Sequence, residues 1–149
     1  MPTAARLLSA VCLAIIAYVV SEMVMVGMLS QEPDLNFGRL REINVFIAAS
    51  VGWTMLGARV GNPYSVSLGL GLTAIAAAVF WCVFAHAFWE MLKFSIDRKF
   101  DGPMEALVGM VQLAIEYSAE LLRVNVLITL VMGGLFGGLF AEFISRRWR

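Results

Sequence analysis

Apolar residues in this chain gather in four long runs separated by short polar segments. A helix rises 1.5 Å per residue, so about 20 apolar residues cross a hydrocarbon core about 30 Å thick. Backbone groups find no water inside lipid, and the alternating pattern of a membrane barrel is missing, so the runs must be helices. The sequence therefore predicts an all-α polytopic membrane protein, a four-transmembrane-helix bundle whose helices span about 7–29, 43–60, 66–92 and 124–145.

The first and third runs are the most typical of transmembrane helices. The first, Leu7–Leu29, is interrupted by Ser21 and by one charged residue, Glu22. It is too long for the apolar region of a secretory signal and lacks a small-residue cleavage site, so we expect an uncleaved anchor helix. The third, Val66–Trp89, follows the helix-start signal Asn62-Pro63 and carries no formal charge.

The second and fourth runs are less uniform. Polar positions at Asn44, Ser50 and Thr54 make the second the weakest of the four. The fourth ends in Arg146-Arg147-Trp148-Arg149, an aromatic and basic group typical of a membrane–water boundary. Basic residues are nearly balanced between the two sides of a four-span topology. We therefore rely on these terminal arginines, which adjoin a span, to predict that both termini are cytoplasmic.

An additional amphipathic helix is predicted over 103–121. Asp101 or Gly102 can cap it, Pro103 suits its first turn, and an acid at position 105 faces its positive end. Its polar positions form one stripe, opposite Leu107, Met110, Ala114 and Leu121, and they are Glu105, Gly109, Gln112, Glu116 and Glu120. Three glutamates would be costly inside lipid, so we expect an interfacial helix; the alternative is a fifth span whose acids face the bundle.

Composition supports a single membrane domain covering residues 1–149. The chain is 60% apolar and 15% charged, whereas soluble domains have about 45–50% and about 25%. Eleven basic residues balance eleven acidic ones, so there is no basic field for nucleic acid, and lipid is the first expected partner. Two cysteines without a CxxC pair indicate neither a disulfide scaffold nor a zinc ribbon, and we expect no disulfide between Cys12 and Cys82.

Four intramembrane polar residues are the candidates for chemistry: Glu22, His86, Glu90 and Glu142. Their positions along the helices place the first three near one membrane face and Glu142 near the other. Cys82 shares one side of the third run with His86 and Glu90, and these groups could hold a metal or relay protons if Glu22 or Glu120 completed the set. The simpler interpretation is a polar edge beside the interfacial residues Trp81 and Trp89, so we assign no metal and no cofactor.

Small residues in the fourth run predict close helix packing. The glycines Gly133, Gly134, Gly137 and Gly138 form two overlapping G-x-x-x-G pairs, along which another helix can dock. That helix belongs either to the same chain or to another subunit. Catalytic signatures such as G-x-S-x-G, H-E-x-x-H or a phosphate-binding loop do not occur, which favours a non-enzymatic protein.

Several blocks distributed over nearly the whole chain resemble the TrgA family of small bacterial membrane proteins associated with tellurite resistance. These blocks are Met1 to Leu7, Val51-Gly52-Trp53, Gly57 to Gly61, Thr73 to Phe84, Phe100 to Ala106 and Arg146 to Arg149. The resemblance implies a multi-pass protein of the bacterial inner membrane. It supplies no catalytic residues. A thiol in hydrocarbon remains protonated, so direct reaction of Cys12 or Cys82 with tellurite is not favoured.

Three functional hypotheses follow from these features. The first is a non-enzymatic inner-membrane protein that contributes to tellurite resistance or to membrane and redox homeostasis. It could act as an accessory subunit that docks on another membrane protein, or on a second copy of itself, through the glycine-rich faces. The second is a small transporter or ion-conducting oligomer with a route through Glu22, His86 and Glu90. The third is a metal- or haem-linked redox component that uses Cys82 and His86.

Overall fold

The computed structural model describes residues 3–30, 38–97 and 102–147, and the secondary structure in these ranges is helical, with no strand. The all-α class is therefore confirmed. In chain order the elements are α1 (Thr3–Leu29), α2 (Leu40–Val51), the π-helical segment η1 (Gly52–Leu56), α3 (Tyr64–Ile96), α4 (Pro103–Leu121) and α5 (Val124–Arg147).

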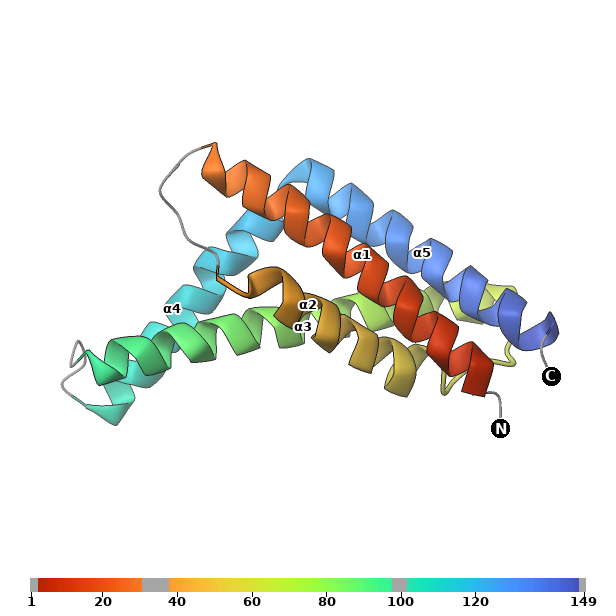
Figure 1. The fold of residues 1–149 in the computed structure, drawn as a ribbon, viewed down its shortest axis with the longest axis horizontal. Helices are drawn as coiled ribbons and strands as arrows, with labels where there is room; N and C mark the ends of the chain where they lie inside the picture. The colour runs from red at the N-terminus through yellow and green to blue at the C-terminus, as the bar shows by residue number, and fades with distance from the viewer. Residues whose placement is uncertain (1–2, 31–37, 98–101, 148–149) are drawn as a thin grey trace.

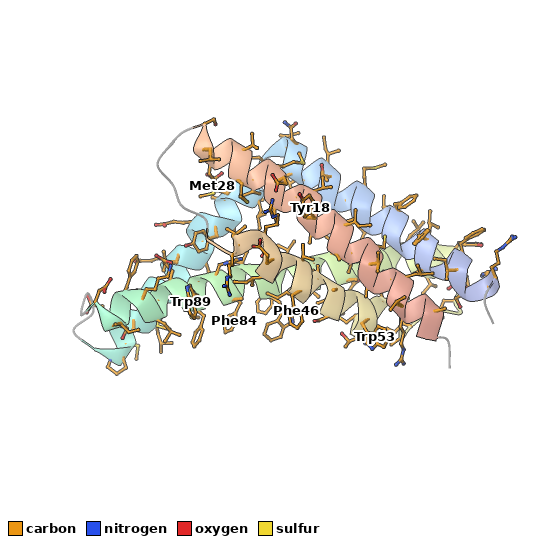
Figure 2. All side chains as sticks on the ribbon, viewed as in Figure 1. Tyr18, Met28, Phe46, Trp53, Phe84 and Trp89 are labelled. Atoms are coloured by element: carbon orange, nitrogen blue, oxygen red, sulfur yellow. The ribbon has the colours of Figure 1, made fainter. Side chains whose placement is uncertain are left out.

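Three helices are long and apolar enough to cross a membrane: Ala4–Leu29 of α1, α3 and α5. Large apolar side chains cover their outer surfaces, among them Ile15, Phe80 and Phe136, which are 59%, 62% and 63% exposed. Figure 2 shows the aromatic side chains of Phe84 and Trp89 on the outside of the bundle. A surface of this kind is stable against lipid rather than water, so the helices indicate a membrane protein.

The predicted second span differs from the structure. Its residues form α2, with 12 residues, followed directly by η1, with five, and together they are shorter than a typical span of about 20 residues. The predicted count of four transmembrane helices is therefore not confirmed. The helix changes to π geometry where Gly52 and Gly57 lie against α1; a Cβ atom at Gly52 would come within 2.8 Å of Ala10 Cα. The amide of Gly57 closes the π turn by donating to the carbonyl oxygen of Gly52 at 2.8 Å.

The long helices form a bundle in which α5 packs against both α1 and α3 (Figure 1). The start of α1, the start of α3 and the end of α5 lie at one end of the bundle, which we call the Glu142 end. The end of α1 and the start of α5 lie toward the opposite end. α2 packs on α1 and α3, and the core of the bundle consists largely of small and branched residues such as Leu13, Ala48, Ile75 and Ala141.

α4 has the bounds that the sequence predicts, and it runs across the direction of α1 and α5 rather than along it (Figure 1). Gly102 is its extended N-cap residue and Pro103 occupies the first turn. Three faces follow from its residue exposure. Ala106 lies on the buried face, which packs on α3; Glu116 lies on an exposed polar face; and Ile115 lies on an exposed apolar face. The predicted apolar side is thus divided into a packed part and an exposed part.

Candidate functional site

The carboxylate of Glu142 is the most completely bonded polar group described in the bundle. Its side chain is 1% exposed. One oxygen accepts hydrogen bonds from the amides of Gly61 and Asn62 at 2.8 and 3.2 Å, and the Ser67 hydroxyl lies 3.4 Å away. The other oxygen accepts a bond from Arg146 Nε at 2.8 Å. Since buried charge is tolerated only when it is paired and hydrogen-bonded, this arrangement explains how Glu142 is accommodated.

The sequence around the loop before α3 makes these contacts possible. Gly61 has φ +101, a conformation that residues with side chains rarely adopt, and this turns its amide toward α5. Arg146 also donates to the carbonyl oxygen of Asn62 at 3.0 Å, and its guanidinium lies 4.4 Å from the ring centroid of Tyr64. These contacts join the start of α3 to the end of α5. Glu142 is therefore a structural clamp in this arrangement.

Two glycines of the predicted ridge face α3. A Cβ atom at Gly138 would overlap the backbone of Ser67, and one at Gly71 of α3 would come within 2.8 Å of the Gly138 amide nitrogen. At Gly134 a Cβ would lie 3.2 Å from the side chain of Ile75. The backbones of α3 and α5 thus meet along a glycine surface, as expected for small-residue packing.

The other two glycines face α1. A Cβ atom at Gly133 would come within 2.9 Å of Ile16, whereas one at Gly137 would make ordinary contacts with Leu13 and Cys12 at 3.5 and 3.7 Å. The helices that pack on the four glycines, α1 and α3, belong to the same chain. Another subunit would have to bind a different surface.

A second polar cluster joins α1, α2 and α3, and we call it the polar bridge: Ser21, Asn44 and His86. Asn44 Nδ2 donates to Ser21 Oγ at 3.0 Å, and His86 Nε2 lies 2.8 Å from Asn44 Oδ1. Because the amide oxygen can only accept, the network assigns the imidazole proton to Nε2. His86 is thereby a donor in an interhelical contact, and its Nδ1 atom is not part of that bond.

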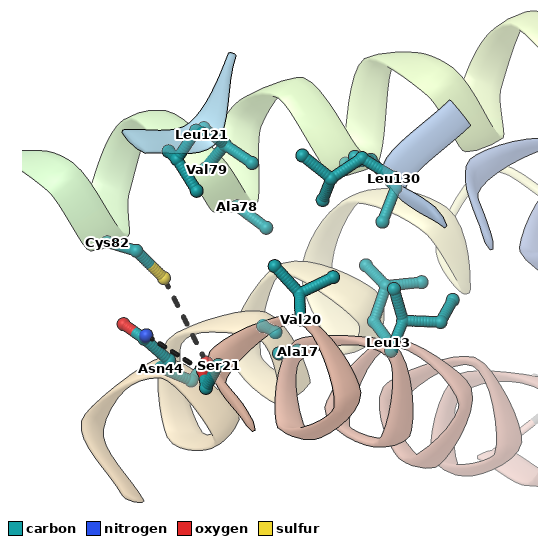
Figure 3. Close-up of a pocket in the computed structure, with 13 residues that line it drawn as sticks. Leu13, Ala17, Val20, Ser21, Asn44, Ala78, Val79, Cys82, Leu121 and Leu130 are labelled. Atoms are coloured by element: carbon teal, nitrogen blue, oxygen red, sulfur yellow. Dashed lines mark hydrogen bonds between the residues drawn. The ribbon is translucent and has the colours of Figure 1, made fainter. Parts of the chain in front are cut away.

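Cys82 lies beside the polar bridge at one end of a cavity of about 60 Å³. Its Sγ atom is 4.0 Å from the backbone oxygen of Asn44. Figure 3 shows Ser21, Asn44 and Cys82 at this polar end, with Leu13 and Leu130 among the apolar side chains that form the remainder. The volume exceeds the roughly 10–15 Å³ that one water needs, but the lining offers polar partners at one end only. Cys82 and Cys12 are both free thiols.

Glu22 makes an ion pair with Arg41 of α2. The Arg41 guanidinium also lies 5.3 Å from the ring centroid of Tyr18 and 3.8 Å from Glu42. The role of Glu22 is therefore to hold the start of α2 against α1.

Glu90 makes its ion pair outside the polar bridge. Its carboxylate pairs with Lys93 at 2.9 Å, and that lysine is half exposed. On α4, burial raises the pKa of Tyr117, with smaller contributions from the charges of Glu90 and Glu116. Glu90 thus belongs to the contact between α3 and α4.

The structure corrects two of the site hypotheses. Cys82 and His86 meet at Asn44, but Glu90 and Glu22 turn to separate basic partners, and Glu120 pairs with Arg123 at 2.7 Å. Within residues 3–30, 38–97 and 102–147, no three His, Cys, Asp or Glu side chains gather in a way that could hold a metal ion. Glu22, His86 and Glu90 bond to Arg41, Asn44 and Lys93 respectively, and no hydrogen bond or ion pair described in the structure links the three to one another.

The comparisons with known proteins assign this chain to no family. No protein-family model matches the chain, and neither the curated proteins nor the solved structures contain a significant match. The resemblance to TrgA therefore stays a prediction from the sequence blocks given above.

Proposed function

We propose that this chain is a non-enzymatic inner-membrane protein of bacteria, a helix bundle that crosses the bilayer four times. The observation that carries the proposal is the arrangement of the three long apolar helices. α1 begins at the Glu142 end and ends at the opposite end, yet α3 begins at the Glu142 end again. The segment between them must therefore return through the membrane.

α2 and η1 are the returning segment in this proposal. The start of α2 is held near the end of α1 by the pair Arg41–Glu22, and the loop after η1 reaches Glu142 through Gly61. A short helix and a loop can cross where protein covers their backbone, and η1 packs on α1 and α3. Both termini then lie on the same side, which we propose is the cytoplasm.

α4 fits the position of an interfacial helix. It runs across the bundle direction (Figure 1), and its exposed surface is divided between acidic and apolar residues. Met104 and Ile115, which are 73% and 64% exposed, would face acyl chains, while Glu116 would face water. A fifth span would instead place Glu116 in lipid, which is costly.

The polar residues favour a structural role over transport. Glu142, Glu22 and His86 each make bonds between elements of the bundle, as described above. Together with the blocks that resemble TrgA, this supports a contribution to tellurite resistance through membrane organisation or redox homeostasis. In this proposal the chain neither reduces nor transports the oxyanion. An accessory role with another membrane protein would use a surface other than the glycine ridge.

The topology is tested by two single cysteines in a chain whose native cysteines are replaced by alanine. Arg39→Cys and Arg59→Cys lie before α2 and after η1. If the segment crosses, a membrane-impermeant maleimide labels only one of them in intact cells and both after lysis. Equal labelling of both in intact cells overturns the four-crossing proposal, and extraction of the chain by alkaline carbonate overturns membrane insertion itself.

The proposed role is tested in a strain that lacks the gene. We expect lower growth on tellurite, restored by the wild-type chain and by Cys82→Ala, because the thiol is not used chemically. Unchanged resistance in the deletion strain contradicts the proposed contribution. Loss of resistance in Cys82→Ala, with normal protein levels, favours direct thiol chemistry instead.

A further inference from the structure

An open apolar groove of about 440 Å³ lies between α3 and α4. Its α3 wall contains Phe80 and Phe84, whose rings stack with centroids 6.3 Å apart. Its α4 wall contains Val111, Ile115, Ala119 and Leu122, which succeed one another at helical spacing. Several of these side chains are well exposed; Ile115 and Leu122, for example, are 64% and 66% exposed. The groove is thus a lined surface that the described chain leaves uncovered.

The apolar side chains that line the groove favour a hydrocarbon as its occupant. Ser118 supplies the hydroxyl in the groove, and it already donates to the carbonyl oxygen of Ala114 at 2.7 Å. All the other lining residues have apolar side chains. An occupant with polar groups would lose its hydrogen bonds to water in the groove and find no new ones there. The binding of an apolar occupant is stabilised by each methylene that it buries.

The size of the groove distinguishes a lipid chain from a protein helix. A methylene takes up about 30 Å³, the share of a water molecule in the liquid, so there is room for about 15 of them. From Val111 to Leu122 the groove extends about 16 Å. A helix with its side chains is about 10–12 Å wide and rises about 5.4 Å per turn, so at most about one of its turns would fit.

We propose that the groove between α3 and α4 binds one acyl chain of a membrane phospholipid. The chain lies between the stacked phenylalanines of α3 and the apolar face of α4, and it completes the packing of α4 on the bundle. The inference rests on the proposed membrane location. It adds a defined lipid site to the general contact that any membrane protein makes with the bilayer.

Two matched substitutions test the site. Ala119→Phe places a ring in the groove, whereas Ala76→Phe makes the same change at an exposed position of α3 that does not line it. The full chain is purified in mild detergent with phosphatidylethanolamine added at a few molecules per chain, and retained lipid is measured by native mass spectrometry. Circular dichroism and gel filtration verify that both variants remain folded.

We expect about one lipid retained per wild-type chain and per Ala76→Phe chain. In Ala119→Phe, retention should be at least about tenfold weaker, which corresponds to exclusion of roughly two methylenes. A second reading uses Trp81, which adjoins Phe80 with ring centroids 5.6 Å apart. In a chain where Trp81 is the sole tryptophan, phosphatidylcholine brominated on its acyl chains should quench its fluorescence saturably, and Ala119→Phe should remove this saturable part.

Equal retention by the two variants overturns the site while leaving the membrane proposal intact. A wild-type dimer that Ala119→Phe separates into monomers overturns it in favour of a second copy as the occupant. Failure of membrane insertion is recognised separately. In that case alkaline carbonate would extract the wild-type chain and both variants from the membrane to the same extent.

Discussion

The two ends of the bundle accommodate buried polar side chains in different ways. At the Glu142 end, a charged group is 1% exposed and surrounded by donors from a loop and from its own helix. Toward the opposite end, the neutral side chains of Ser21, Asn44 and His86 share two hydrogen bonds beside a cavity of about 60 Å³. The surroundings of Glu142 are closely packed and highly bonded, whereas the polar bridge is sparsely bonded and leaves space.

This difference predicts where the bundle is rigid. A buried charge with several partners resists separation of the helices, because removing any partner leaves polar atoms without bonds. A neutral bond between transmembrane helices contributes less, on average about 0.6 kcal/mol. We therefore expect the start of α3 to stay fixed on α5 and the region around Asn44 to open first.

Glu142→Gln should give the largest effect. The carboxylate of Glu142 accepts hydrogen bonds from Gly61 and Arg146, whereas the NH2 group of glutamine can only donate and would face one of these donors. We therefore expect the free energy of unfolding to fall by about 3 kcal/mol. Unfolding in mixed micelles with increasing SDS, followed by circular dichroism, measures it. Glu116→Gln, at an exposed position of α4, is the control. Equal stability of the two variants would show that the Glu142 end is not the stronger one.

Gly138→Ala should have the next largest effect. The new methyl group would overlap the backbone of Ser67, so α3 and α5 must separate, at a cost of about 2 kcal/mol. Gly137→Ala is the matched control, because its Cβ would meet Leu13 and Cys12 at ordinary distances. The same SDS titration distinguishes them, and identical midpoints contradict the close approach of α3 and α5.

Asn44→Ala should be milder, at about 1 kcal/mol, because it removes neutral bonds to Ser21 and His86. Hydrogen exchange should become faster in α2 while the start of α3 stays protected. Asn125→Ala, at an exposed position of α5, serves as the control. If protection falls equally at both ends of the bundle, the two ends do not open independently.

Glu90→Gln should have the smallest effect, below about 0.5 kcal/mol, since its partner Lys93 is half exposed. The same variant tests transport. Ion flux through liposomes containing the wild-type chain that disappears with Glu90→Gln would establish a conducting route that the separated positions of Glu22, His86 and Glu90 do not support.

Patterns along one helix were predictable, and contacts between distant segments were not. Glycine spacing identified the docking ridge, and the capping residues identified α4 with its bounds. Glu142 stood out as a buried acid, but its partner Gly61 is 81 positions away in the chain, and no local pattern connects them. The choice of helix on which the ridge docks depends on the same tertiary arrangement.

Asn44 illustrates why the contacts between helices could not be predicted from the sequence. In the sequence it weakens an apolar run, whereas in the structure it is the centre of the polar bridge. The change to π geometry at Gly52 was equally hidden, since it follows from the backbone of α1 lying against that glycine. Single polar residues in otherwise apolar segments signal bonds between helices, but they do not reveal with which helix.

The length of α3 has a mechanical consequence. Its 33 residues extend about 50 Å, against a hydrocarbon thickness of about 30 Å. The excess must be absorbed by inclination or by protrusion, and a thicker bilayer draws such a helix upright. Because α4 packs on α3, any change in inclination also moves α4 relative to the lipid headgroups. Bilayer thickness is thus a physical input to which the shape of this protein responds.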